Sequence, residues 1–259
     1  MPTSAIHDER VAPSASTASA VAALFVYECA SDGPLVSIPR PEVHLVVRFG
    51  SPTRGDIDAH ALGSRDRAHR KVLRTGQRAV TARLHLGASE AVFGVPASAV
   101  AGRVVALDTL WGSAATRRLL DRLADSRSTS DAAAVLDSAI SERMLRAAPR
   151  RAPALLTLAA ADRLTSASVN AVAVDLGVSE RHLRRVFRET VGVSPKTFAK
   201  LTRFHRALRA ARDDVRPNWA EVAAMAGYYD QAHLIAEFRA ITGATPRSLL
   251  RELHAASLG

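Results

Sequence analysis

Four arginines lie within the nine residues from Glu180 to Arg188 and could bind an anionic partner. Leu183, Val186 and Phe187 recur at the spacing of one helix face, which we assign to the core. The remaining charged side chains then point outward, and they are Glu180, Arg181, Arg184, Arg185 and Arg188. A guanidinium can form two hydrogen bonds with guanine O6 and N7 or clamp a phosphate. An isolated charge run is more often a solvated helix face, so the surrounding elements must decide.

The surrounding sequence contains one pattern twice. Val169, Val172, Ala173 and Leu176 follow an i, i+3, i+4, i+7 spacing, and Trp219, Val222, Ala223 and Ala226 repeat that spacing 50 positions later. The next helix repeats at an offset of 51, as do the following segments GVSP at 192–195 and GATP at 243–246. Two copies of one supersecondary unit explain this regularity.

Cap residues define the unit. Ser168 and Asn218 can cap the first helix of each copy, and Ser179 and Asp230 can cap the second. A glycine between the helices, Gly177 or Gly227, favours the left-handed conformation that ends a helix. Ser-Pro or Thr-Pro then starts a third helix. Each copy is therefore predicted to be a helix-turn-helix with a support helix, which favours the DNA-binding interpretation of the arginine face.

At these residues the chain resembles the AraC/XylS family of bacterial transcription regulators. The runs GVSERHLRRVFRETVGVSP at 177–195 and GYYDQAHLIAEFRAITGATP at 227–246 are similar to the two signature segments of that family. The resemblance covers about the last hundred residues. It implies two recognition helices in successive segments of the DNA major groove. A linking helix from Thr197 to about Arg212 would hold them apart.

The resemblance also implies base contacts, which by position fall on Arg181, Arg184 and Arg185 in the first unit and on Gln231, Ala232, Ile235 and Ala236 in the second. The recognition helices and their caps add further candidate DNA-binding residues. These are Ser179, Glu180 and Arg188 in the first unit and Asp230, His233 and Arg239 in the second. The family commonly has arginine at the position of Ala236, so we expect the first unit to dominate specificity. The second unit would position the protein on phosphates, helped by Arg239 and Arg247, or contact thymine methyls through Ile235 and Ala236.

Length and charge agree with this interpretation. A chain of 259 residues favours two domains, and its formal net charge is +10. Residues 150–259 hold 17 Lys and Arg against 10 Asp and Glu, so the basic excess is concentrated there. No run approaches the ~20 apolar residues of a membrane span. Cys29 is the only cysteine, and the start of the chain lacks the basic residues of a signal peptide, so we expect a cytoplasmic protein.

The fold class is predicted as α+β. We expect a disordered lead-in at 1–20, a small β-rich domain at 21–146 closed by a helical hairpin, a linker at 147–152, and an all-α domain with two helix-turn-helix units at 153–259. Strand-length runs cover 23–29, 43–49, 57–62, 71–74, 79–86 and 104–107. Helical patterns cover 88–93, 97–100, 114–124 and 131–146.

The first domain offers a candidate effector pocket. Alternation within 43–49 and 79–86 puts His44, Arg48, Arg83 and His85 opposite the apolar face of their strands. If these four side chains line a pocket, they would suit an anionic or hydrogen-bonding effector. The alternative is that this face of the sheet simply faces water. Histidines 44, 60, 69 and 85 match no short metal-ligand spacing. We therefore expect no metal and no other cofactor.

These observations predict a sequence-specific DNA-binding transcription regulator that responds to an effector through its N-terminal domain. The alternative is a constitutive nucleic-acid-binding or protein-docking module without ligand sensing. Candidate partners are double-stranded DNA, a small-molecule effector, a second copy of the chain, and RNA polymerase for an activator. No GxxxxGK[ST], GxSxG or HExxH motif is present, so no enzyme is predicted. A Cys29 nucleophile paired with a sheet histidine is the remaining enzymatic alternative.

Overall fold

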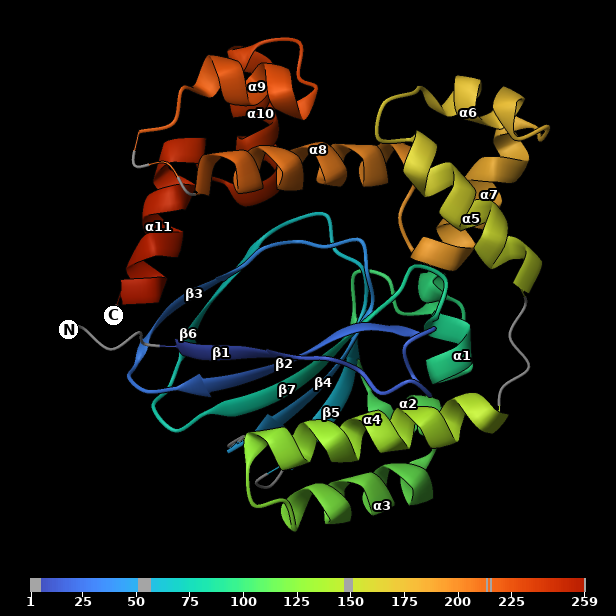
Figure 1. Cartoon of the computed structure of the whole chain (residues 1–259), viewed down its shortest axis with the longest axis vertical. Helices are drawn as coiled ribbons and strands as arrows, with labels where there is room; N and C mark the ends of the chain where they lie inside the picture. The colour runs from blue at the N-terminus through green and yellow to red at the C-terminus, as the bar shows by residue number, and fades with distance from the viewer. Residues whose placement is uncertain (1–5, 51–56, 147–150, 213, 215, 259) are drawn as a thin grey trace.

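A computed structural model of the chain describes residues 6–50, 57–146, 151–212, 214 and 216–258. Its N-terminal part is a six-stranded antiparallel sheet next to a two-stranded hairpin (Figure 1). In spatial order the sheet strands are β1 (Ile6–Val11), β2 (Val21–Cys29), β7 (Arg78–Leu84), β4 (His44–Phe49), β5 (Ile57–Leu62) and β8 (Val104–Ala106). The hairpin consists of β3 (Gly33–Ser37) and β6 (His69–Leu73).

One face of the sheet is apolar, as the alternation predicts. Leu45, Val47 and Phe49 of β4 are buried, and they contribute to the same core as Val80 and Leu84 of β7. Helices cover this face: α4 (Thr129–Arg146) lies over β2 and β7, and α3 (Ser113–Ala124) packs on β5 (Figure 1). Shorter pieces complete the layer, namely α1 (Ser89–Phe93), η1 (Ala97–Ala99) and α2 (Leu107–Trp111).

Part of the predicted lead-in is ordered. We expected residues 1–20 to be disordered, but β1 pairs with β2 along its whole length, from Ile6 opposite Cys29 to Val11 opposite Leu24. The following turn is also fixed, because the Thr17 hydroxyl donates to the buried carboxylate of Asp137 on α4. β1 lies at the edge of the sheet, where charged residues are common, and Asp8, Glu9 and Arg10 leave its sequence with little apolar alternation. Residues 1–5 lie outside the described part of the chain.

Seven helices form the described C-terminal part: α5 (Arg151–Arg163), α6 (Val169–Asp175), α7 (Glu180–Val191), α8 (Pro195–Arg212), α9 (Trp219–Ala226), α10 (Gln231–Thr242) and α11 (Pro246–Leu258). The predicted fold class is confirmed. The linking helix α8 begins two residues before the predicted Thr197, and α5 begins at Arg151, two residues before the predicted start of the C-terminal domain at 153. Of the predicted linker 147–152, residues 147–150 lie outside the described residues.

The predicted caps of both units are present. Ser168 and Ser179 each accept a hydrogen bond from the backbone N–H three residues later, and Asp230 does the same for His233. Asn218 accepts from the N–H of Ala220. Gly177 has a φ of 65° and Gly227 has a φ of 84°, so both adopt the left-handed conformation. Two helix-turn-helix units therefore flank α8.

The hairpin arm, β3 and β6, packs against the second unit rather than the sheet core. Val36 of β3 is buried among Phe204 and Leu249, which belong to α8 and α11 (Figure 1). The backbone N–H of Ala68 donates to the carbonyl of Ile241 at 2.9 Å. Both parts of the chain thus share one apolar cluster. Among the described helices, none is long and apolar enough to cross a membrane.

Candidate nucleic-acid interface

The outward face of α7 carries the predicted cations. Arg181, Arg184, Arg185 and Arg188 are exposed, whereas Leu183 and Phe187 are fully buried against α5 and α6. The helix is fixed at its start by the Ser179 cap and at its end by Gly192. The arginines are therefore held on a rigid element and directed to solvent. Such a surface suits a polyanion.

Two of the four arginines are held by acidic neighbours. Arg184 Nε donates to Glu180 Oε1 at 2.7 Å, and Arg185 Nη1 donates to Glu189 Oε1 at 3.2 Å. Both pairs span one helical turn and are solvent-exposed. Within the described residues, Arg181 and Arg188 form no ion pair. The first unit therefore presents two unpaired and two paired guanidinium groups.

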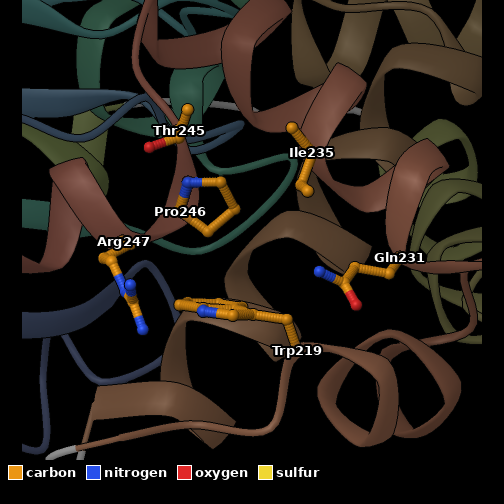
Figure 2. Close-up of a pocket in the computed structure, with 6 residues that line it drawn as sticks. All are labelled: Trp219, Gln231, Ile235, Thr245, Pro246 and Arg247. Carbon is orange, nitrogen blue, oxygen red and sulfur yellow. The ribbon is translucent and has the colours of Figure 1, made fainter.

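The second unit presents a different surface. Gln231, Ala232, His233, Ala236 and Arg239 of α10 are exposed, and Ile235 is half-buried. Beside them lies a hollow of about 290 Å³, here called the α10 hollow (Figure 2). It is lined by Trp219, Gln231, Ile235, Thr245, Pro246 and Arg247. Figure 2 shows the Trp219 indole forming one wall, with Gln231 and Ile235 from α10 across the opening.

A charged network positions α10 on the linking helix. Arg203 of α8 donates from Nη2 to Glu237 Oε1 at 2.7 Å, and His233 Nε2 lies 3.6 Å from the same oxygen. The Arg203 guanidinium also lies over the Tyr228 ring, 5.6 Å from its centroid. Burial, reinforced by Glu237, raises the pKa of Tyr228 above its ordinary value. Sequence reasoning missed this network, although Glu237 stands where the first copy has the apolar Val186.

A family model described as "Helix-turn-helix domain" matches residues 172–252. The C-terminal part of the chain is an AraC-type helix-turn-helix domain. The resemblance seen in the two signature segments is thereby confirmed. The matched domain is of a kind found in DNA-binding transcription regulators.

Several solved structures are similar to this chain. The DNA-binding domain of AdpA, solved with a target DNA, is 24% identical with a TM-score of 0.35, covering 40% of this chain and 93% of that one. The C-terminal domain of AraT from Geobacillus stearothermophilus is 22% identical with a TM-score of 0.34, covering 37% of this chain and 84% of that one. ToxT from Vibrio cholerae is 7% identical with a TM-score of 0.45, covering 96% of this chain and 98% of that one. No curated protein matches the chain.

The candidate effector residues of the N-terminal part fall in different places. His44 and Arg83 are directly opposite one another on β4 and β7. Arg48 instead pairs with Asp58, with Nε and Nη2 3.1 and 3.0 Å from its two carboxylate oxygens. His85 is exposed and lies just beyond the end of β7. The structure therefore brings together only His44 and Arg83 of the four.

Further arginines act on His44, and His205 of α8 lies close by, with its Nε2 2.8 Å from the Pro39 carbonyl. We call the three arginines Arg40, Arg65 and Arg83, together with the neutral histidines His44 and His205, the cation cluster. Burial, reinforced by the charges of Arg40, Arg83 and Arg65, lowers the pKa of His44 to about 3. Burial and the charge of Arg40 lower the pKa of His205, on α8, to about 4. Burial also lowers the pKa of the Arg83 guanidinium, against the raising influence of Glu42.

Hydrogen-bonding capacity in the cation cluster is left unused. Arg65 Nε and Arg83 Nε are buried without a hydrogen-bond partner among the described residues. The Arg83 guanidinium stacks over the Phe25 ring, 5.3 Å from its centroid, and a ring accepts no conventional hydrogen bond. Glu42 is an acidic neighbour that raises the pKa of Arg83, and its Oε2 is also buried without a hydrogen-bond partner among the described residues. Among the described residues, no group of three His, Cys, Asp or Glu could hold a metal ion.

Proposed function

We propose that this chain is a sequence-specific transcription regulator that reads DNA with both helix-turn-helix units and responds to an anionic effector bound at the cation cluster. The observation that carries the DNA-reading part is the exposed arginine face of α7 on a capped, duplicated helix-turn-helix. Arginine forks supply bidentate contacts to guanine, and phosphate contacts set the register. We expect the first unit to supply most base discrimination.

Selection of sites from a random duplex pool by the full chain tests the DNA-reading part. The selected duplex should compete at least tenfold better than random duplex, and binding should weaken steeply with salt because phosphate contacts release counterions. Competition by single-stranded RNA measures the alternative of a general nucleic-acid-binding module. Equal affinity for selected duplex, random duplex and RNA would contradict sequence-specific reading.

The cation cluster supports the effector part. His44 lies on β4, Arg83 on β7 and His205 on the linking helix α8. Arg40 lies just before β4, and Arg65 lies just after β5. Buried, unpaired guanidinium nitrogens are costly, and a carboxylate or phosphate oxygen would satisfy them. Because α8 joins the two DNA-reading units, an anion touching both the sheet and α8 would bias their separation. We therefore include His44 and Arg83 of the predicted pocket in the proposed effector site and add Arg40, Arg65 and His205 to it.

A panel of carboxylates and inorganic phosphate, screened by thermal shift on the full chain, tests this site. An anion that raises the melting temperature should also change affinity for the selected duplex. Arg83→Gln should abolish both responses while leaving DNA binding measurable, and Arg103→Gln, an exposed arginine outside the cluster, should leave them intact. Duplex binding that no anion changes would favour the constitutive DNA-binding alternative.

A further inference from the structure

The α10 hollow differs from the corresponding place in the first unit. Gln231 and Ile235 line it, and 51 positions earlier the same helical positions hold Glu180 and Arg184. In the first unit those two side chains form an ion pair. In the second unit the same two positions hold an amide and an apolar side chain. Because the helix-turn-helix fold accepts either pair, folding does not require an apolar residue at the position of Ile235.

The apolar wall of the hollow is fixed in position. Trp219 is the first residue of α9, where the first copy has Val169. Its indole packs edge-on against Phe238, with ring centroids 6.4 Å apart and an interplanar angle of 69°. Phe238 is fully buried, so the indole is anchored to the core. Trp219, Ile235 and Pro246 therefore form a preformed apolar surface that opens beside the start of α10 (Figure 2).

The rim of the hollow is polar and basic. Gln231, at the first position of α10, places a side-chain amide at the opening, and Arg247 of α11 places an exposed guanidinium on the other side (Figure 2). An apolar floor with a cationic rim does not suit a phosphate alone, because a phosphate would leave the indole and Ile235 facing water. It suits a DNA strand that brings an apolar group and a phosphate together.

We propose that the α10 hollow receives the 5-methyl group of an operator thymine, packed between Trp219 and Ile235, while Arg247 contacts a neighbouring phosphate. Thymine is the only standard base with a methyl group in the major groove. Burial of that methyl selects thymine without a hydrogen bond to its edge. Gln231 remains free to bond an adjacent base. This inference rests on the proposed DNA-reading function and assigns Trp219 and Ile235 as specificity residues of the second unit.

Deoxyuridine substitution in the selected duplex tests the proposal, because it removes the methyl and keeps the hydrogen-bonding edge. Each thymine is replaced in turn, and the dissociation constant of the full chain is measured. Arg184→Ala identifies the half-site of each unit. Base preference should relax in the half-site of the first unit and stay unchanged in that of the second. One thymine there should show about fourfold weaker binding as deoxyuridine, the effect of one buried methyl.

Variants of the protein assign the effect to the hollow. Ile235→Ala and Trp219→Ala should remove the difference between thymine and deoxyuridine at that position, whereas Val169→Ala in the first unit should keep it. Comparison of the two duplexes with the same variant cancels any loss of folded protein. Unchanged affinity for every deoxyuridine duplex, or an undiminished difference in Ile235→Ala, would overturn the proposal. Failure to bind any duplex would instead overturn the proposed function.

Discussion

Arg184 lies one helical turn after Glu180 on α7, and its Nε donates to Glu180 Oε1 across 2.7 Å. The pair is solvent-exposed, so it contributes about 0–1 kcal/mol to the stability of the helix. Its larger consequence concerns DNA. Glu180 holds the guanidinium along the helix surface, and a guanine or phosphate must compete with that carboxylate for the same N–H groups.

Arg184→Ala should weaken binding to the selected duplex by about 1–3 kcal/mol and relax base preference at one position. The loss arises because a bidentate contact to one base disappears while phosphate contacts remain. Quantitative gel shifts on single-base operator variants measure both effects. Arg117→Ala, which removes an exposed arginine from α3, is the matched control and should change neither. An unchanged preference profile would mean that Arg184 does not read a base.

Glu180→Gln should tighten binding to both selected and random duplex by about two- to fivefold. The substitution releases Arg184 and removes a negative charge that would face the phosphates. The gain should shrink as salt rises, because it is electrostatic. Fluorescence anisotropy at several salt concentrations provides the measurement, with Glu142→Gln on α4 as a control that also loses an arginine partner. Weaker binding by Glu180→Gln would show that the carboxylate itself contacts DNA.

Gly192→Ala should destabilise the fold more than Gly177→Ala. Both glycines have positive φ, 89° and 65°, so alanine costs about 1–2 kcal/mol at either position. At Gly192 a Cβ would also lie 2.4 Å from Ser64 Oγ and 3.1 Å from the Ala97 carbonyl, whereas the space around Gly177 is open. Urea denaturation of both variants measures the difference. Equal destabilisation would indicate that α7 does not rest on the N-terminal part in solution.

Stability should fall as the pH drops below about 6.5. His44 and His205 have folded pKa values of about 3 and 4, against an ordinary value of 6.5. As the pH falls from about 6.5 to 4, these histidines therefore become protonated in the unfolded chain before they do in the folded chain, and the free energy of unfolding decreases. Above pH 6.5 this contribution is fully present.

The variant His205→Gln keeps an N–H donor for the Pro39 carbonyl, which the His205 ring contacts at 2.8 Å, but it does not titrate. Its free energy of unfolding should depend less on pH between 6.5 and 4 than that of the wild type. Denaturation curves across this range provide the comparison. Parallel pH dependence in the two proteins would argue that His205 titrates normally when folded.

Arg70→Ala should loosen the hairpin arm from the second unit. Arg70 of β6 donates to the Thr242 carbonyl at 2.8 Å and to Glu252 Oε2 at 2.9 Å. Without it, the amide of Ala68, bonded to the Ile241 carbonyl, should exchange its hydrogen faster, because local opening becomes easier. Hydrogen-exchange mass spectrometry detects this change.

Arg74→Ala is the control for the arm, because it removes an arginine pair with Asp32 that stays within the N-terminal part. It should leave exchange at Ala68 unchanged. Equal acceleration by both variants would mean that the arm opens independently of the second unit. Slow exchange in Arg70→Ala would mean that the apolar contacts of Val36 suffice to hold it.

Much of the DNA-reading domain was predictable from the sequence because its signals are local. Ser179, Gly177 and their counterparts act within a few residues of the helix ends that they define. The helical period alone places Leu183 inside and Arg184 outside. The strand alternation placed His44 and Arg83 on one face in the same way, and most strand bounds were predicted to within two residues.

Tertiary contacts decided what those local signals left open. The edge strand β1 exists because β2 offers it a partner, and the hairpin arm has its place because Val36 fits against α8 and α11. Arg48 pairs with Asp58 on the neighbouring strand, so the proposed effector site does not include it. The sequence alone thus determined the two helix-turn-helix units and the exposed arginines of α7, because helix caps and helical periodicity act over a few residues. Only folding determined the cation cluster and the α10 hollow, since each gathers side chains from segments far apart in the chain.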